Sequence, residues 1–493
     1  MLVTCQQMQE IEAAAFARGI HAADLMQQAG CGIAAEVSRF FPKPGSLILY
    51  LGSGNNAGDA LVAARELQEK GWLIHVRLSG PANKLKPLPA RHLQALPAVC
   101  QLSEPVEMET LPRPIVQLDG LLGIGATGAL REDVRLLAAE MNVQRLKHRA
   151  STVAMDIPSG LNGDTGIPEE DAVIADLTVT VAYAKQGLLA DTAINHVGRL
   201  ALVPLPDLKP DWATPDTGSQ LLTPEFLRPV LPRRDFDFHK GRAGRVGIIA
   251  GSAGYYGAAI LACAGALRAG GGLVTLLVKA EAYPILASKA PPEVMVKVVK
   301  DYREALDRSF DSLGIGPGIG LTAEAEILDI IRTAPLTCIL DADAITLLAR
   351  GHSAIFESPA PRLLTPHPGE MQRLMPGIQH ETRVTQARLA AERFKGHTLL
   401  LKGARTIIAT HGQMTTYNTT GHPGMATGGM GDVLTGVCTA LSAQGIPLPQ
   451  AAGMAAWSSG RAAEMAALTL GQNAVLPSDV AAHLGAAFLE LEE

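Results

Sequence analysis

The feature that most constrains the fold of this chain is a regular alternation of short, continuous apolar runs with longer alanine-rich runs. Each short run is apolar throughout rather than at every second residue, as expected for strands that are covered on both faces. This pattern predicts an α/β fold with parallel sheets and helices on both sides of each sheet. In the first part of the chain the expected strands are SLILYL (46–51), LIHVRL (73–78), PIVQLDG (114–120), STVAMDI (151–157) and DLTVTVAY (176–183).

The alternation stops and then restarts, which indicates two domains in a chain of 493 residues. Residues 201–232 contain seven prolines and are the expected linker, with Thr223 capping a new helix and Pro224 at its first position. We therefore expect α/β domains at residues 1–215 and 222–493. The expected strands of the second domain lie in RVGIIAG (245–251), LVTLLV (273–278), SLGIG (312–316), TCILDAD (337–343), RLLTP (362–366) and HTLLLKG (397–403), followed by a hairpin that turns at His411–Gly412.

Charge and composition exclude several classes of protein. The 42 basic and 48 acidic side chains give a net charge of −6, without a basic run, which argues against nucleic-acid binding. Six cysteines without a CxxC pair argue against a zinc site or a disulfide framework. The apolar run at 257–278 contains Arg268 and three consecutive glycines, so a helix, a turn and a strand are expected there rather than a membrane span. We expect a cytoplasmic protein that binds no membrane.

Polar or glycine-rich sequence follows four expected strands of the first half, where a parallel sheet binds its ligands. Glycines let backbone N–H groups approach a phosphate, and a following helix adds its positive end. Tight turns without a ligand are the alternative, but four such loops at one edge favour a binding site. The loops are GSGNNAGDA (52–60), DGLLGIGATGA (119–129), DIPSGLNGDTG (156–166) and YAKQG (183–187).

The loop GSGNNAGD has neither the P-loop lysine nor the GxGxxG spacing. Together with GIHAADLMQQAG (19–30), it resembles the YjeF N-terminal domain, the NAD(P)H-hydrate epimerase family, over most of residues 1–215. That family usually has GNNGGDG, and Ala57 and Ala60 replace two of its glycines here. The resemblance implies a Rossmann-like fold and a site for the hydrated dinucleotide at Asn55, Asn56, Ala57, Gly58, Asp59, Gly123, Ile124, Gly125, Ala126, Thr127, Gly128 and Ala129.

The same resemblance places Asp156 at the reacting ring and a potassium ion near Asn56, Asp119 and Ser159. Amide, carboxylate and hydroxyl oxygens suit such a hard cation, although Asp119 and Ser159 could instead be helix caps. Asp156 and Lys185 both lie at strand ends and could exchange protons, but Lys185 could equally be a solvated surface lysine.

The second half carries a different set of strand-end sequences, of which GMATGGMGDVLTG (424–436) is the most informative. Glycines that run into a helix, with a carboxylate inside the anion hole, suit phosphoryl transfer, because the N–H groups hold the phosphate while the carboxylate takes a proton. Asp432 could alternatively be a simple N-cap. The other strand-end sequences are GSAGYYGAA (251–259), GIGPGIG (314–320), DADA (341–344), TPHPGE (365–370) and LKGART (401–406).

This set resembles the ribokinase-like superfamily and, more closely, the YjeF C-terminal domain, a nucleotide-dependent NAD(P)H-hydrate dehydratase, over about 225–490. It implies a ribokinase-like α/β/α domain. Glu370 and Asp341 could face magnesium, but capping is the simpler interpretation, and His367 could be a structural histidine. The implied hydrate contacts are Ala258, Gly318, His367 and Asp432, and the implied ADP or ATP contacts are Lys402, Gly403, Ala404, Arg405, Thr406 and Gly431.

Both resemblances together imply repair of hydrated nicotinamide cofactors. The first domain would interconvert the R and S forms of NAD(P)H-hydrate with potassium, and Asp156 and Lys185 would move protons. The second would dehydrate the S form with magnesium and ADP or ATP, and Asp432 would be the base. We expect a homo-oligomer. Two alternatives are a small-alcohol kinase in the second half, and in the first half a non-catalytic module like those of mRNA-decapping scaffolds. The sequence does not decide between ADP and ATP, or between the two hydrates.

Overall fold

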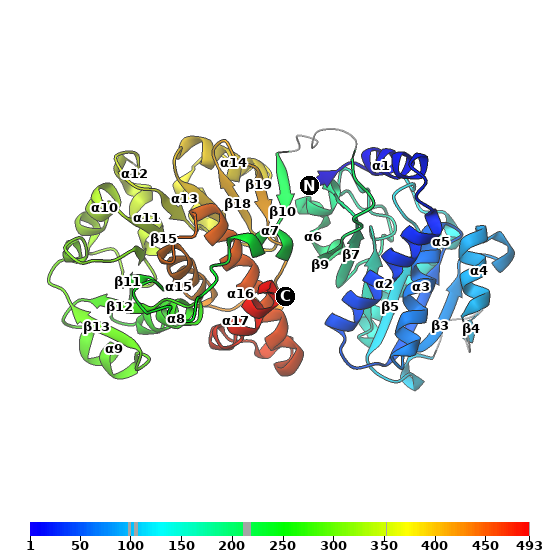
Figure 1. Cartoon of the computed structure of the whole chain (residues 1–493), viewed down its shortest axis with the longest axis horizontal. Helices are drawn as coiled ribbons and strands as arrows, with labels where there is room; N and C mark the ends of the chain where they lie inside the picture. Colours follow the sequence, from blue (N-terminus) through cyan, green and yellow to red (C-terminus); the bar gives the residue numbers. More distant parts are fainter. Residues whose placement is uncertain (97–99, 103–106, 211–217, 352, 493) are drawn as a thin grey trace. The chain divides into compact units, whose positions relative to one another are not determined.

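The computed structural model describes residues 1–96, 100–102, 107–210, 218–351 and 353–492 (Figure 1). The chain forms two compact units, Met1–Thr217 and Gly218–Glu493. The proposed boundary at residue 215, and part of the proline-rich segment, lie outside the described residues. The second unit begins before the predicted residue 222, because β10 (Ser219–Leu221) pairs with β19 (Thr415–Tyr417) of that unit.

The first unit is built on a seven-stranded sheet with the order β4-β3-β2-β5-β6-β7-β9. All of its neighbouring strands are parallel, which confirms the predicted parallel sheet. A separate parallel pair joins β1 (Leu2–Val3) to β8 (Ala184–Lys185). The strands of the sheet are β2 (Ser46–Leu51), β3 (Leu73–Leu78), β4 (Cys100–Leu102), β5 (Ile115–Gly120), β6 (Ser151–Met155), β7 (Leu177–Val181) and β9 (Arg199–Val203).

Both faces of this sheet are buried, as the unbroken apolar runs predict. Leu47, Leu49 and Leu51 face a core shared with α2 and α3, which lie side by side in Figure 1, whereas Ile48 and Tyr50 face α5. Alternate residues of one strand therefore serve two different cores. The helices are α1 (Cys5–Ala17), α2 (Ala22–Phe40), α3 (Asn55–Glu69), α4 (Pro87–Ala95), α5 (Glu132–His148) and α6 (Ile194–Val197).

The strand order contains a topological switch point. From β2 the chain builds β3 and β4 on one side and then returns to add β5, β6, β7 and β9 on the other. The loops after β2 and β5 therefore diverge at the carboxyl edge, where open α/β sheets bind ligands. A Cβ at Gly52, just after β2, would collide with the carbonyl of Leu121, just after β5. Glycine at that position is what allows the two loops to touch.

The second unit contains a ten-stranded sheet with the order β10-β19-β18-β17-β16-β15-β14-β11-β12-β13. Its strands from β13 to β17 are parallel, and β18 pairs antiparallel to both β17 and β19, as the predicted hairpin requires. Its switch point lies between β11 and β14. The strands are β11 (Arg245–Ile249), β12 (Leu273–Val278), β13 (Val294–Val298), β14 (Ser312–Ile315), β15 (Thr337–Leu340), β16 (Arg362–Leu364), β17 (Thr398–Leu401) and β18 (Ile407–Thr410), besides β10 and β19.

Glycines let two helices of this unit approach closely. A Cβ at Gly436 would collide with the carbonyl of Ala262, and one at Gly265 with that of Val433, so α8 and α15 lie backbone to backbone (Figure 1). This contact fixes the start of α15 beside the sheet. The helices are α7 (Pro224–Leu227), α8 (Tyr256–Arg268), α9 (Tyr283–Lys289), α10 (Glu324–Thr333), α11 (Asp343–Arg350), α12 (Ser353–Phe356), α13 (Pro368–Leu374), α14 (Arg383–Arg393), α15 (Met430–Ala443), α16 (Leu448–Leu470) and α17 (Pro477–Glu492).

Two local predictions about helices can be compared with these bounds. The apolar run at 257–278 divides into α8 and β12 as predicted, and no helix in the described part of the chain is long and apolar enough to cross a bilayer. Thr223 is the N-cap of α7 and Pro224 its first residue, also as predicted, although the Thr223 side chain makes no capping hydrogen bond.

Candidate active sites

The first site lies at the switch point of the first unit. Gly54 is the N-cap of α3, so Asn55 to Asp59 form the first turns of that helix. The amide nitrogen of Asn56 donates to the carbonyl of Leu122 at 2.6 Å. The asparagine loop after β2 and the glycine loop after β5 are thus joined directly, and the start of α3 points its N–H groups to this edge.

Asp119 and Ser159 meet in the same place. Asp119 is the fifth residue of β5 and is fully buried. Its carboxylate accepts from the Ser159 hydroxyl at 2.7 Å, from the Ser159 N–H at 2.7 Å and from the Leu121 N–H at 3.2 Å. Burial raises the pKa of Asp119 to about 6, against the lowering effect of these hydrogen bonds. Neither residue caps a helix, so the capping alternative does not apply: they tie the loops after β5 and β6 together.

A pocket lies between those two loops. One wall is formed by the glycine loop after β5, including Gly123, Ala126, Thr127 and Gly128 of the predicted set. The residues 157–162 form the opposite wall. The other predicted loop residues, Ile124, Gly125 and Ala129, do not line it. The pocket is therefore an opening at the carboxyl edge of β5 and β6.

Asp156 and Lys185 form an ion pair beside this edge. Lys185 is 1% exposed, which excludes the surface-lysine alternative. Asp156 also accepts from the Thr180 hydroxyl at 3.1 Å and the Val181 N–H at 3.2 Å. Its φ of 64° is a left-handed conformation that is uncommon outside glycine, and such strain persists where surrounding contacts impose it. The pairing of β1 with β8 holds Lys185 in place.

Two further carboxylates, Asp59 and Glu12, interact with Asp156, which the sequence did not predict. Burial, followed by the charges of Asp156 and Glu12, raises the pKa of Asp59 well above its ordinary value. Burial and Asp156 likewise raise the pKa of Glu12, against the effect of Lys185. Glu12 lies on α1, far from the glycine loops in sequence. Glu12 looks like an ordinary polar residue of an amphipathic helix, so the sequence gives no sign that it lies near the site.

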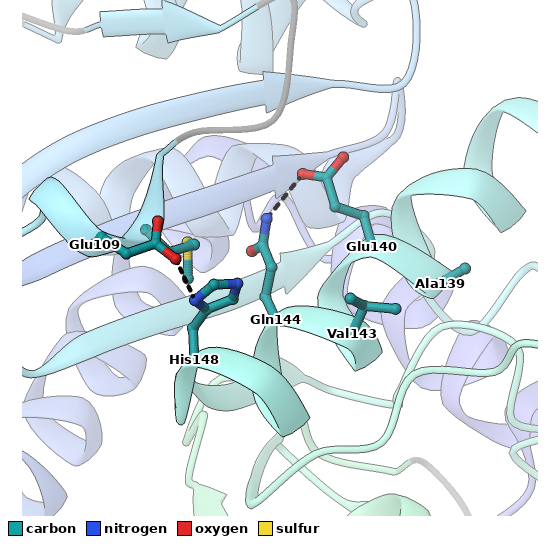
Figure 2. A pocket seen from close by; sticks show the side chains of 7 residues that line it. Glu109, Ala139, Glu140, Val143, Gln144 and His148 are labelled. Carbon is teal, nitrogen blue, oxygen red and sulfur yellow. Dashed lines mark hydrogen bonds and ion pairs between the residues drawn. The ribbon is translucent and has the colours of Figure 1, made fainter.

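A separate hollow of about 420 Å³ lies elsewhere on the first unit (Figure 2). It is lined by the last turns of α5 and by Met108 and Glu109, with Glu109 paired to His148 at 3.2 Å. These residues precede β5 and β6, so the hollow is at the amino ends of the strands. None of the predicted site residues lines it.

The second site lies at the switch point of the second unit. Gly318 follows β14 with a φ of 60°, and a Cβ there would lie 2.6 Å from the Cβ of Tyr255 and 3.3 Å from that of Ala258. The hydroxyl of Ser252, after β11, donates to the Gly318 carbonyl at 2.8 Å. The structure thus brings together Ala258 and Gly318, two residues predicted to contact one ligand.

Asp432 lies in the first turn of α15, of which Gly429 is the N-cap with a φ of 103°. Asp432 is therefore not the N-cap, and the simple capping alternative is wrong. Burial, followed by the charge of Asp341, raises the pKa of Asp432 to about 6, while Lys402 acts in the opposite direction. A half-buried carboxylate at a helix start has the position and the acidity of a general base that works near neutral pH.

Asp341 lies behind Asp432 and does not cap a helix, contrary to its simpler interpretation. Its carboxylate accepts from Lys402 Nζ at 2.5 Å and from the hydroxyls of Thr365 and Thr435 at 2.8 Å each. A second carboxylate, Glu370, lies 3.7 Å from Lys402 Nζ. Burial alone would lower the pKa of Lys402, but Asp341 and Glu370 outweigh it and raise that pKa.

The histidine expected at the site has a clear structural role. His367 is the N-cap of α13, and its Nδ1 accepts from the Gly369 N–H at 3.0 Å. Glu370 returns the contact by accepting from the His367 N–H at 2.8 Å. The capping interpretation of Glu370 is therefore confirmed. The His367 side chain is 52% exposed, and its Nε2 lies 3.5 Å from Glu370 Oε1.

The segment Lys402–Thr406 is the turn between β17 and β18. Gly403 has a φ of 140°, and the guanidinium of Arg383 donates to the carbonyls of Lys402 and Ala404 on its outer side. The Thr406 hydroxyl donates to the Gly403 carbonyl at 3.1 Å. Lys402 points from this turn to Asp341, so the turn and the start of α15 share one side of the site.

Comparison with known proteins decides the family. Residues 22–187 match the family described as YjeF-related protein N-terminus, and residues 246–485 match NAD(P)H-hydrate dehydratase. The bifunctional NAD(P)H-hydrate repair enzyme of Moorella thermoacetica is 34% identical, covering 100% of this chain and 97% of that protein. The Coxiella burnetii enzyme of the same name is 35% identical over 97% of each. The chain belongs to the bifunctional NAD(P)H-hydrate repair enzymes.

A solved structure agrees for the second unit. A ribokinase-like superfamily protein from Enterococcus faecalis is 29% identical, with a TM-score of 0.51, and covers 57% of this chain and 100% of its own. The predicted ribokinase-like fold is confirmed. Because the repair-enzyme relatives match along both halves, the alternative of a small-alcohol kinase joined to a non-catalytic module is set aside.

The sequence of this repair enzyme did not predict the side chains that hold the site aspartates in place. Thr365 and Thr435, which hold Asp341, were not predicted, although Thr435 follows Asp432 by one helical turn in GDVLTG. Thr180 was also missed, because a threonine within an apolar strand looks like core. In the described part of the chain, no group of three or more His, Cys, Asp or Glu is placed to hold a metal ion.

Proposed function

We propose that this repair enzyme restores NADH and NADPH from their hydrates by two reactions at the two switch-point sites. The first unit interconverts the R and S hydrates, and the second dehydrates the S hydrate with ADP or ATP. The observation that carries the proposal is that each site places an aspartate and a largely covered lysine beside glycine-rich loops at the carboxyl edge of a parallel sheet.

The dehydration follows from the chemistry of the hydrate. Its hydroxyl is bonded to a carbon next to the ring nitrogen, and hydroxide is a poor leaving group. Asp432 takes the hydroxyl proton as the oxygen attacks the terminal phosphorus of the nucleotide, and the shortened nucleotide leaves. The nitrogen lone pair then expels phosphate by breaking the C–O bond, and loss of a proton from the neighbouring carbon restores the double bond. The start of α15 supplies N–H donors for the transferred phosphate.

The dinucleotide and nucleotide contacts in this unit follow from the same arrangement. Ala258 and Gly318 line the switch point and suit the hydrated dinucleotide, and the half-exposed side chain of His367 suits contact with the same ligand. The turn Lys402–Thr406 and Gly431 suit the ADP or ATP. Magnesium would arrive with the nucleotide phosphates and neutralise their charge. Asp341 and Glu370 do not fit as its ligands, because the Lys402 ammonium lies 2.5 Å from Asp341 and 3.7 Å from Glu370 and already offsets their charge.

The epimerisation inverts the carbon that carries the hydroxyl. As the hydroxyl loses its proton, a carbonyl forms and the C–N bond breaks, and the ring nitrogen takes up a proton. The nitrogen then loses that proton and attacks the other face of the carbonyl, whose oxygen regains a proton. The Asp156–Lys185 pair can hold and return that proton without exposure to solvent, because Lys185 is buried. The residues Asn55 to Asp59 and Gly123 to Ala129 suit the dinucleotide phosphates at the start of α3.

Potassium fits the cluster of Asn56, Asp119 and Ser159. Asp119 is a fully buried carboxylate, and within the described residues no cation lies at ion-pair distance from it. The Asn56 amide nitrogen is already bonded, which leaves its amide oxygen for an ion. When bound, a monovalent cation would offset the charge of Asp119 and of the nearby phosphates. A single carboxylate with neutral oxygens offers too little charge to favour a divalent ion strongly.

Epimerisation is assigned to the unit Met1–Thr217 and dehydration to the unit Gly218–Glu493, within a homo-oligomer whose size light scattering can measure. The test of the proposal uses pure S hydrate, the full chain, magnesium, and either ADP or ATP. We expect NADH absorbance to appear with an equal amount of phosphate, and only when a nucleotide is present. Formation of NADH without nucleotide consumption would contradict the phosphorylated intermediate.

A further inference from the structure

The lysine of the second site faces a cluster of carboxylates. Lys402 Nζ lies 2.5 Å from Asp341 and 3.7 Å from Glu370, in a position with little exposure to water. A Cβ at Gly431 would lie 3.3 Å from Lys402 Nζ and 3.4 Å from Asp341 Oδ2. The ion pair therefore lies directly beneath the first turn of α15, next to Asp432.

The position of this ion pair is set by several elements at once. Asp341 follows β15, Thr365 follows β16, Lys402 follows β17, and Thr435 lies on α15. The two threonine hydroxyls donate to Asp341 and so fix its carboxylate. Thr435 is also within hydrogen-bond distance of the Gly431 carbonyl, at 3.0 Å, which links the cluster to the turn that contains Asp432.

We infer that Lys402 is a positioning residue for the dehydration: Asp341 and Glu370 together hold its ammonium group beneath the start of α15, where that ammonium offsets the charge of Asp432. The inference rests on the proposed role of Asp432 as the base. Asp341, Glu370 and Asp432 share one lysine, so each charge in the cluster affects the others. Asp341 opposes ionisation of Asp432 by its own charge and favours it through Lys402.

The charges that face Asp432 are therefore of both signs. Asp341 and Lys402 face it from the ends of β15 and β17, and Cys438, on the same helix, is buried beside the same two groups. Removing the charge of Asp341 alone takes away a negative charge, while Glu370 still holds Lys402 beneath α15, so the ionised base is favoured. Removing Lys402 alone leaves three carboxylates without their shared cation, which disfavours it.

The test is the pH profile of kcat/KM for the S hydrate at saturating nucleotide, in the full-length protein. Asp341→Asn keeps the shape of the side chain and accepts from one threonine; its amide nitrogen can donate to the other hydroxyl, which has a backbone carbonyl as an alternative acceptor. We expect its acid limb to move to lower pH, by roughly one unit for a neighbouring charge. Lys402→Met should move the limb to higher pH by a similar amount. Titration of the nucleotide phosphates is common to all variants and cancels in the comparison.

Asp311→Asn is the matched control, because Asp311 also pairs with a basic residue, Arg245, but at the amino ends of the strands. Its acid limb should stay where it is in the parent protein. Limbs that do not move in the two site variants, or that move in the same direction, would overturn the inference even if turnover falls. If Asp341→Asn does not fold, Lys402→Met decides the question. A fully active Asp432→Asn would instead reject the proposed base itself.

Discussion

The two units solve a similar problem with different supports. Both place an aspartate and a lysine with little exposure to water at the carboxyl edge of a parallel sheet, beside a glycine-rich switch point. In the first unit the reactive pair is direct, since Lys185 contacts Asp156. In the second, Lys402 contacts Asp341, and Asp432 stands apart at the start of α15. A direct pair suits a proton that leaves and returns, whereas a separated base suits one that is taken as phosphate arrives.

The largest effect should come from Asp432→Asn. Without its base, dehydration of the S hydrate should fall by roughly 10²- to 10⁴-fold, because general-base catalysis contributes that much. Epimerisation should be unaffected, and NADH absorbance with chromatography of the two hydrates would measure both. Asp329→Asn, another partly exposed acid of the same unit, is the control. Near-normal dehydration in this variant would mean that Asp432 is not the base, and the proposed difference between the two units would be wrong.

Changes to the Asp156–Lys185 pair should slow epimerisation and leave dehydration intact. Asp156→Asn and Lys185→Met should each slow epimerisation by roughly 10²-fold, since either change leaves the proton with only one partner. Dehydration of pure S hydrate should remain at the parental rate. Exchange between the separated R and S forms, corrected for the spontaneous rate, measures the change. An unaltered rate in Lys185→Met would leave the lysine a purely structural role.

A smaller and pH-dependent effect is expected from potassium. The folded pKa of Asp119 is about 6, above its ordinary value of 3.8, so the folded state loses stability relative to the unfolded chain as pH rises from about 4 through 6. Bound potassium should offset that loss. Potassium should therefore raise the melting temperature of the epimerase unit more at pH 7 than at pH 5, by a few degrees at saturation.

Asp119→Ala should abolish this potassium effect and weaken hydrate binding for epimerisation, while dehydration is unchanged. Sodium and choline chloride at equal ionic strength are the controls for screening. If potassium stabilises Asp119→Ala as much as the parent protein, the ion binds elsewhere. If its effect does not grow with pH, the proposed potassium site at Asp119 is wrong.

The smallest change is expected when the two units are separated. Each has its own buried core, so fragments 1–217 and 218–493 should each fold and keep one activity at close to the full-chain rate. A fragment that begins at residue 222 lacks β10, which covers the edge of β19, and should be less soluble and melt earlier. Insolubility of fragment 1–217 would mean that the units share a core. If fragments 218–493 and 222–493 melt at the same temperature, β10 is dispensable for the stability of the second unit.

Much of the fold is predictable from the sequence because its central strands are unbroken apolar runs. SLILYL, LIHVRL and LVTLLV coincide with β2, β3 and β12. The strands that were not expected are short or lie at sheet edges, such as β10 and β13. β13 (VMVKV) has only its first residue buried, and Lys297 interrupts its apolar residues. Pairing with a neighbour, rather than local composition, makes such segments strands.

The candidate sites were predictable only in part, for a related reason. Glycine loops and Asp432 are visible in the sequence because their spacing is local. The pair Asp341–Lys402 is not, because its members come from different strands and meet through the register of β15, β16 and β17. Glu12 is a further case, since α1 reaches the epimerase site after β1 pairs with β8.

The most direct test of two cooperating sites on one chain is the recovery of NADH from a racemic hydrate. Pure full-length protein would be mixed with equal amounts of R and S NADH-hydrate, magnesium, potassium, and ADP or ATP, and NADH absorbance followed to completion. We predict that the whole racemate returns to NADH, in a single course faster than spontaneous epimerisation allows. Recovery that stops at half, and then continues only at the spontaneous rate, would contradict an active first unit.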